Sequence, residues 1–388
     1  MASSRSGRGA GMVAFVGGRH GGTTESDRKV RGRSRGLATA VAVLAVVVLL
    51  CGPAAVSGAQ AGDSITGSLG PPIVRVAGVD AIGTSIATSK RWFPGIYGPA
   101  SAVVLARSDY FSDALAGGPL AATVNGPLLI TPGAALSATL DPRVLAEIQR
   151  VIPAPHPVLI LGGPLALSPS IDATLVNLGY QVLRLQGANQ FATAVSIGAA
   201  IEFVRGPVNV IFEATGLHFA DALSAVPATI QQAGVILLTN GATQSPETAA
   251  ALSAHAPVTR YAIGGPLAAF GADPSAIPIY GNDLWGTSAA VAQTFFPFGA
   301  TPLIGSPLMY GAATGLNFPD ALSGGPILRA WGPMLLVGPH APIPSPIADY
   351  LAQACQILGY AFGGPLAVGD DALAGLEAAV GSMAVCVA

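Results

Sequence analysis

Three aspartates recur in one short motif and are the first candidates for chemistry. Each stands two positions after an aromatic residue and directly before Ala-Leu, and the three are Asp113, Asp221 and Asp320. Repeated carboxylates could bind a metal ion or act as general acids. Acidic residues are also favoured in the first turn of a helix by the helix dipole. We expect the second, structural role, because no nucleophile motif or paired-carboxylate motif accompanies them.

A Gly-Gly-Pro-Leu-Ala motif is the second candidate and also occurs three times. Backbone N–H groups in glycine-rich turns can bind phosphate or sugar groups. Paired glycines more often only permit a tight turn at the end of a strand. The repeated glycines, which we expect to be structural, are Gly162, Gly163, Gly264, Gly265, Gly363 and Gly364.

The two motifs belong to a longer unit that repeats about every hundred residues, which indicates a repeat architecture. Each copy has an apolar run, the aspartate motif, a short aliphatic run, and a second apolar run closed by Gly-Gly-Pro. We therefore predict a linker and three repeats, with the boundaries 62–73, 74–178, 179–276 and 277–388.

Within a repeat, short apolar runs of strand length alternate with segments rich in helix formers. Residues 102–106 and 157–161 are apolar throughout, whereas 142–152 has the composition of a helix. Strands without polar alternation are typical of parallel sheets that are covered on both faces. The pattern predicts an α/β fold in which each repeat is a small, doubly wound, parallel-sheet unit.

The N-terminal 61 residues have a different character. Basic residues between 28 and 35 precede an apolar run at 37–50 and an Ala59-Gln60-Ala61 triplet. This three-part layout is typical of a secretory signal peptide, and the apolar run is shorter than the ~20 residues that a membrane-spanning helix needs. We predict a cleaved signal at 1–61, so that contact with the membrane is transient.

Charge and cysteine content exclude some functions. Residues 62–388 contain 10 basic and 18 acidic residues, a formal charge of −8, which argues against nucleic-acid binding. Cys355 and Cys386 remain after signal cleavage and could form a disulfide in an exported protein. Neither cysteine lies in a cluster with metal-ligand spacing, so we predict no metal and no cofactor.

These landmarks, repeated behind a signal peptide, resemble the type-2 cell-wall-binding repeat family of bacterial surface proteins. The resemblance covers nearly all of residues 74–388. It implies three toprim-like units in a pseudo-threefold arrangement that hold the protein non-covalently on an anionic wall polymer. The family's Asp-Arg arginine is absent from all three repeat openings. Polymer-binding candidates implied by the resemblance are Arg75, Arg184, Pro127, Leu128, Leu129, Leu237, Leu238, Pro333, Leu335 and Leu336; their hydrophobic members are at least as typical of core.

The sequence therefore predicts a secreted, non-enzymatic protein at the cell wall or cell surface, whose partner is a wall polymer or glycan. Two alternatives stay open. One is an envelope hydrolase or metal-dependent enzyme that uses the repeated aspartates, and the other is a surface protein that self-associates.

Overall fold

The computed structural model describes residues 73–95, 100–297, 309–329, 331–353 and 358–380, which all fall in one compact unit. The predicted signal peptide, nearly all of the predicted linker, Cys355 and Cys386 lie outside the described residues. Among the helices described, none is both long and apolar enough to cross a membrane.

The described strands form three parallel sheets of four strands each, which confirms the predicted α/β units. The strand orders are β3-β2-β4-β5, β7-β6-β8-β9 and β1-β12-β10-β11. In each sheet the chain starts at a central strand, adds the next strand on one side of it, and then crosses over to add the following strand on its other side, as in a doubly wound fold. The strands are β1 (Ile73–Val76), β2 (Val103–Arg107), β3 (Leu128–Thr131), β4 (Pro157–Leu161), β5 (Gln181–Leu185), β6 (Val210–Thr215), β7 (Val235–Thr239), β8 (Thr259–Ile263), β9 (Ile277–Ile279), β10 (Met309–Thr314), β11 (Met334–Val337) and β12 (Leu358–Phe362).

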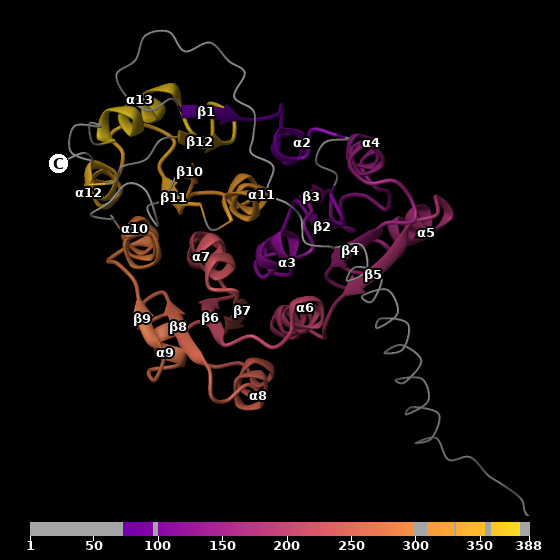
Figure 1. The fold of residues 1–388 in the computed structure, drawn as a ribbon, viewed down its shortest axis with the longest axis horizontal. Coiled ribbons are helices and arrows are strands. Elements are labelled where there is room, and N and C mark those ends of the chain that lie inside the picture. The colour runs from indigo at the N-terminus through magenta and orange to yellow at the C-terminus, as the bar shows by residue number, and fades with distance from the viewer. Residues whose placement is uncertain (1–72, 96–99, 298–308, 330, 354–357, 381–388) are drawn as a thin grey trace, which may run out of the picture. The chain divides into compact units, whose positions relative to one another are not determined.

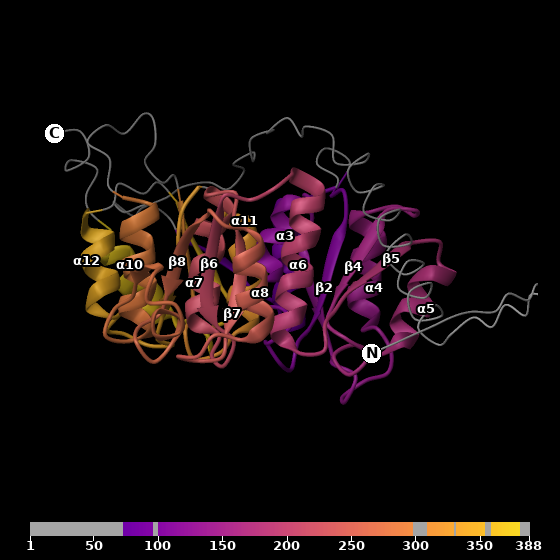
Figure 2. The ribbon, with the colours of Figure 1, turned by 90° about the horizontal axis from the view of Figure 1, so that it is seen from below.

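Helices connect the strands and cover the sheets, and several of them run alongside one another (Figure 2). Polar caps fix where many begin: Ser168, for example, accepts a hydrogen bond at the start of α5, where Pro169 is well placed in the first turn. The helices are α2 (Ala81–Trp92), α3 (Gly117–Thr123), α4 (Pro142–Val151), α5 (Pro169–Asn177), α6 (Gln190–Arg205), α7 (Ala220–Gln231), α8 (Pro246–Ala254), α9 (Ala269–Ala272), α10 (Leu284–Phe295), α11 (Pro319–Leu328), α12 (Ser345–Gln353) and α13 (Asp370–Ala379).

The sequence repeats and the sheets are offset by one strand. β5 and β9 open the second and third repeats, yet they pair with β4 and β8 of the preceding repeats. β1 opens the first repeat and pairs with β12 of the third, from Ile73 opposite Gly359 to Val76 opposite Phe362. Figure 1 shows indigo β1 beside yellow β12. The three units are therefore joined in a closed ring by the first described strand.

Three helices meet where the units come together, and these are α3, α7 and α11 (Figure 1). The rings of Phe111, Phe219 and Phe318, from the aspartate motif, contact one another with centroid separations of 5.6, 5.8 and 6.1 Å. Each such aromatic pair adds about 0.5–1.5 kcal/mol beyond its buried area. This triangle confirms the expected pseudo-threefold arrangement. It also brings the carboxyl ends of β2, β6 and β10 together on one face.

Candidate functional site

The two repeated motifs meet at the carboxyl ends of the strands. A Cβ atom built on the first glycine of each Gly-Gly pair would lie 2.8, 2.5 and 2.6 Å from Oδ2 of Asp113, Asp221 and Asp320, respectively. The same glycines have φ angles of 91°, 107° and 109°, which residues with a side chain rarely adopt. Both the backbone conformation and the nearby carboxylate therefore require glycine at these positions, which are Gly162, Gly264 and Gly363.

The second glycine of each pair is under less constraint. A Cβ on Gly163 would lie 3.2 Å from the Gln186 side chain, and one on Gly265 would lie 3.3 Å from the Tyr280 ring. A Cβ on Gly364 would meet no heavy atom within 4 Å. The two glycines of one motif thus have different roles, although the sequence repeats both.

The three aspartates are partly or largely enclosed at these strand ends. Asp221 and Asp320 lie in the first turns of α7 and α11, as expected, whereas Asp113 lies in a turn before α3. Burial raises the pKa of Asp221 to about 6 and also raises the pKa of Asp320. Oδ1 of Asp320 is buried and has no hydrogen-bond partner among the described residues. The nearby Thr84 side chain partly opposes this rise in pKa.

Thr84 belongs to a third repeated feature, which was not predicted from the sequence. Its Oγ1 accepts a hydrogen bond from the N–H of Gly78 at 3.2 Å. The same contact occurs in the other copies, at 3.1 Å for Thr193 and 3.2 Å for Thr287. The recurring Gly-x-Asp/Asn opening with Thr four residues after the Asp or Asn was the signal that could have identified it. Each site is thus built from an aspartate, a glycine turn and the start of the following repeat.

The two arginines proposed as polymer contacts are partly buried and donate hydrogen bonds to backbone carbonyls of the glycine turns. Arg75 donates from Nη1 to the carbonyls of Gly363 (3.0 Å) and Val368 (2.6 Å), and pairs with Asp370 at 2.8 Å. Arg184 donates to the carbonyls of Gly162 (2.9 Å) and Gly163 (3.1 Å) and pairs with Asp172. Their charges are therefore offset within the fold, and polymer contact by these arginines stays a prediction.

The predicted aliphatic contacts lie in the core. Pro127 and Pro333 are buried, and the six leucines lie in strands β3, β7 and β11, where Leu237 is the most exposed at 2%. Helices α2, α6 and α10 pack against these strands. Direct contact between the polymer and Leu128, Leu129, Leu237, Leu238, Leu335 or Leu336 stays a prediction, and their burial speaks against it.

The leucine of the Gly-Gly-Pro-Leu-Ala motif has the opposite environment in every copy. The exposed fractions of Leu165, Leu267 and Leu366 are 88%, 91% and 97%. Packing does not explain a large apolar side chain at this position three times. These leucines were not predicted from the sequence as exposed residues, although their motif is among the least varied features of the repeats.

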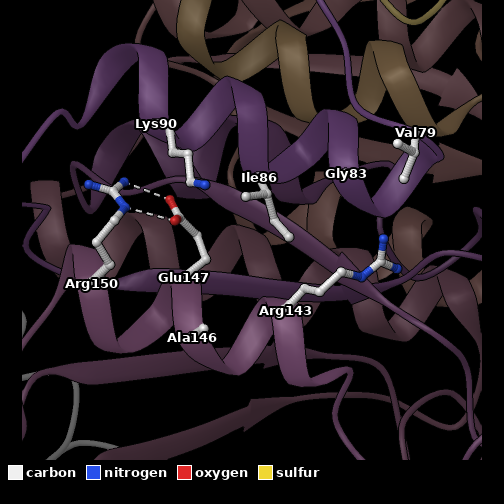
Figure 3. A pocket seen from close by; sticks show the side chains of 8 residues that line it. All are labelled: Val79, Gly83, Ile86, Lys90, Arg143, Ala146, Glu147 and Arg150. Carbon is white, nitrogen blue, oxygen red and sulfur yellow. Dashed lines mark hydrogen bonds and ion pairs between the residues drawn. The ribbon is translucent and has the colours of Figure 1, made fainter.

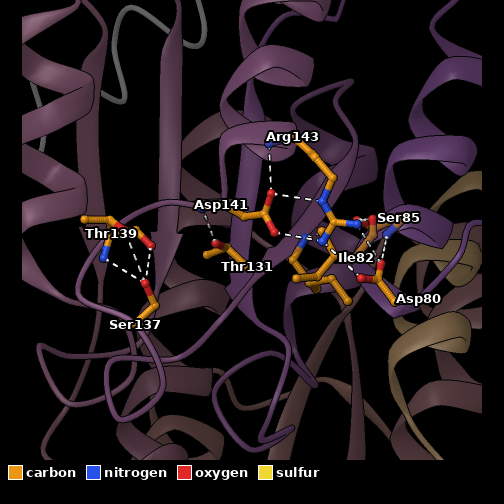
Figure 4. A network of polar contacts seen from close by, with 10 residues as sticks. Asp80, Ile82, Ser85, Thr131, Ser137, Thr139, Asp141 and Arg143 are labelled. Atoms are coloured by element: carbon orange, nitrogen blue, oxygen red, sulfur yellow. Dashed lines mark hydrogen bonds and ion pairs between the residues drawn. The ribbon is translucent and has the colours of Figure 1, made fainter.

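An ion-pair network lies at the opening of the first repeat (Figure 4). Arg143 contacts Oδ2 of Asp80 at 3.0 Å and Oδ2 of Asp141 at 2.8 Å. The hydrogen bond from Arg143 lowers the pKa of Asp141. In the second repeat the equivalent contact joins Asn189 to Glu247 at 2.7 Å. The second residue of the corresponding helix is therefore a cation in the first repeat (Arg143 of α4) and a carboxylate in the second (Glu247 of α8).

Metal ligation finds no support among the residues that the structure describes, since no three or more His, Cys, Asp or Glu side chains gather there in a way that could hold a metal ion.

Comparison with known proteins gives one consistent picture. A model of the family "Cell wall binding domain 2 (CWB2)" matches residues 75–172, 184–269 and 279–373. The N-acetylmuramoyl-L-alanine amidase LytC of Bacillus subtilis (strain 168) is 25% identical over 256 residues, which are 65% of this chain and 47% of that protein. The amidase enhancer of the same organism is 31% identical over 137 residues, which are 35% of this chain and 18% of that protein.

Two solved structures share the fold. Cwp6 from Clostridium difficile has a TM-score of 0.70 at 20% identity, covering 84% of this chain and 51% of that one. Cwp8 from Clostridium difficile has a TM-score of 0.68 at 20% identity, covering 79% and 51%. The chain thus spans about half the length of these proteins and of the amidase.

Proposed function

The chain belongs to the cell wall binding domain 2 family, and from this premise we propose that it is an exported protein that attaches non-covalently to a polymer of the cell wall. The family supports association with the wall. Export rests on the signal-like sequence of residues 1–61. The non-covalent mode is supported by the presence of three similar units, which together could make multiple weak contacts.

The observation that carries this proposal is the threefold recurrence of an exposed leucine on one turn. Leu165, Leu267 and Leu366 each follow a Gly-Gly-Pro turn at the carboxyl end of a strand, where ligands commonly bind in open α/β sheets. Three weak sites on one rigid body raise the avidity for a repetitive polymer without any single strong contact. We therefore assign polymer contact to these turns.

A second candidate function follows from the similarity to the amidase. The raised pKa of Asp221, about 6, is a property that suits a general acid near neutral pH. An envelope hydrolase would use Asp113, Asp221 and Asp320, so asparagine at all three positions would abolish turnover of isolated wall material. Unchanged wall binding by that variant, together with no turnover by the native chain, supports the binding function.

The direct experiment is co-sedimentation of the purified exported protein with isolated Gram-positive cell walls, before and after chemical removal of their secondary anionic polymers. We expect binding to the intact walls and its loss after removal. Failure to bind intact walls contradicts the proposal. Sedimentation of the protein without walls tests the third reading, self-association.

A further inference from the structure

A groove lies between α2 and α4 in the first unit. The two helices start close together, where Arg143 of α4 meets Asp80 at the N-cap of α2, and end close together, where Arg150 donates to the Phe93 carbonyl at 2.8 Å. The cavity between them has a volume of about 530 Å³. Its lining residues are Val79, Gly83, Ile86, Lys90, Arg143, Ala146, Glu147 and Arg150.

Three of the lining residues are cations, although residues 62–388 as a whole carry a formal charge of −8. Figure 3 shows Lys90 and Arg150 at one end of the groove, Arg143 near the other, and Ile86 between them. The middle of the groove is apolar, with Ile86 and Ala146. A ligand that fits this lining has anionic groups carried on an apolar or sugar-like backbone.

The charge balance identifies which cation is available. Arg143 is offset by Asp80 and Asp141, and Arg150 makes hydrogen bonds of 2.7 and 2.6 Å to both oxygens of buried Glu147. Lys90 is exposed, and no ion pair to it is found among the described residues. Its ammonium group is therefore the uncompensated charge of the groove.

Arg150 adds hydrogen-bond donors at the same end. A guanidinium has five N–H groups. Glu147 and the Phe93 carbonyl accept from Nε, Nη2 and Nη1, with one contact each. The remaining N–H groups of the guanidinium can still donate. An oxyanion beside Lys90 would thus receive both a full positive charge and directed donors, which is the strong form of hydrogen bonding.

The other two units have the same helix pair without these cations. Counted from the helix caps and the buried positions, Lys90 corresponds to Ala199 in α6 and Gln293 in α10, and Arg150 corresponds to Ala254 in α8 and Gln353 in α12. The C-terminal ends of the paired helices in those units are joined by other contacts. His255 contacts Glu202 at 2.9 Å in the second unit, and Tyr350 donates to the Phe296 carbonyl at 3.0 Å in the third.

We propose that the groove between α2 and α4 is an oxyanion-binding site, present in the first unit alone among the three, which takes a phosphate or carboxylate group of the wall polymer. The proposal rests on the proposed function for the identity of the polymer, but not for the anion chemistry. It makes the three units unequal: all share the exposed leucine turns, while the first also supplies an ionic contact.

Two single variants with the same charge change test the site. Lys90→Gln removes the charge in the groove and places there the residue type of the third unit. Arg91→Gln is the matched control, because Arg91 is the next residue of α2 but lies over the Tyr360 ring, at 5.9 Å from its centroid, and does not line the groove. Circular dichroism and thermal unfolding are used to check that both variants fold.

Two assays separate this inference from the proposed function. In co-sedimentation with walls, we expect Lys90→Gln to lower the affinity about tenfold, the loss of roughly one charge-assisted contact, and Arg91→Gln to leave it within about twofold. Native binding by Lys90→Gln, or an equal loss in both variants, overturns the site while the wall-binding function stands.

The second assay is calorimetric titration with inorganic pyrophosphate, which needs no wall. Binding by the native protein that weakens in Lys90→Gln but not in Arg91→Gln supports the site even if the walls are not bound. No pyrophosphate binding, or binding that is equal in Lys90→Gln, overturns it. Competition with acetate in the same titration distinguishes a site for phosphate from one for carboxylate groups.

Discussion

Arg75 and Asp370, 295 residues apart in the sequence, form an ion pair that fastens the first described strand to the last described helix. The pair joins the two repeats that close the ring, because β1 lies in the sheet of the third unit. The same guanidinium also holds the glycine turn of that unit through two backbone carbonyls.

The first prediction separates these two kinds of contact. Arg75→Ala leaves the carbonyls of Gly363 and Val368 without their donor, and we expect it to lower the free energy of unfolding by about 1–3 kcal/mol. Asp370→Ala removes an acid whose side chain is 86% exposed, which should cost less than about 1 kcal/mol. Urea unfolding measures both. An equal cost for the two variants would show that Arg75 contributes to stability through the ion pair with Asp370 and not through its hydrogen bonds to the turn.

The second prediction uses the two glycines of one motif. Gly363→Ala forces a side chain into a backbone conformation with φ of 109° and against Asp320, so we expect a loss of about 2 kcal/mol or more. Gly364→Ala meets open space and should change stability by less than about 1 kcal/mol. Thermal unfolding of the two variants provides the comparison. Equal stability of the two would contradict the strand-end geometry described above.

The third prediction concerns pH. Glu213 lies in β6 with no exposed surface, and burial, followed by nearby Asp273, raises its pKa to about 8. Between the unperturbed pKa of 4.5 and about 8, the unfolded chain releases this proton while the folded chain keeps it. Raising the pH through this window therefore lowers stability, by an amount on the order of a few kcal/mol.

The measurement is the free energy of unfolding from pH 5 to pH 9 for the native chain and for Glu213→Gln. We expect the variant to lose less stability over this range, because its amide does not titrate. Asp221→Asn is the control. Because the pKa of Asp221 is raised only to about 6, its titration should affect the free energy of unfolding below about pH 6 and not at higher pH. Parallel pH profiles for the native chain and Glu213→Gln would exclude Glu213 as the cause.

The fourth prediction concerns the aromatic triangle. Phe318→Ala removes a ring that is 8% exposed and contacts both partners, so we expect a cost of about 3–5 kcal/mol. Phe203→Ala, at a position that is 39% exposed, is the control and should cost less than about 1 kcal/mol. Guanidinium unfolding followed by tryptophan fluorescence reports on both. A cost for Phe318→Ala no larger than the control's would mean that the triangle does not hold the units together.

The fifth prediction concerns the exposed leucines. Replacement of Leu165, Leu267 and Leu366 by serine should leave stability within about 1 kcal/mol, because little buried area is lost. If the turns contact the polymer together, single replacements reduce wall binding modestly and the triple replacement reduces it much more than any one of them. Co-sedimentation with walls measures the series. Native binding by the triple variant rules out the turns as the contact surface.

Sequence patterns predicted the units well, because a strand buried on both faces leaves an apolar run that is visible without the structure. The residues of β2 and β4 are of this kind. The offset of β1, β5 and β9 was not predictable in the same way. An edge strand of three to five residues carries no sequence signal for the sheet that it joins.

The candidate site was harder to predict than the fold. Leu128 and Leu129 have the composition of either a core strand or an apolar binding surface, and packing of α2 against β3 decides between them. Arg75 and Arg184 could be interpreted as ligands for an anion, since their internal partners are backbone carbonyls and distant aspartates, which the sequence does not reveal. The strand-end contact of Asp320 with Gly363 depends on a turn geometry that motif recurrence alone does not supply.

The closed ring also has a consequence for the order in which the protein is made. Residue 75 leaves the ribosome long before residue 363, and its guanidinium meets that carbonyl across a separation of 288 residues. Contacts of such high sequence separation form slowly. The strand that is synthesised first therefore joins its sheet last. In a nascent chain that has emerged only as far as its second unit, β1 has no partner strand, because the third unit has not yet been synthesised.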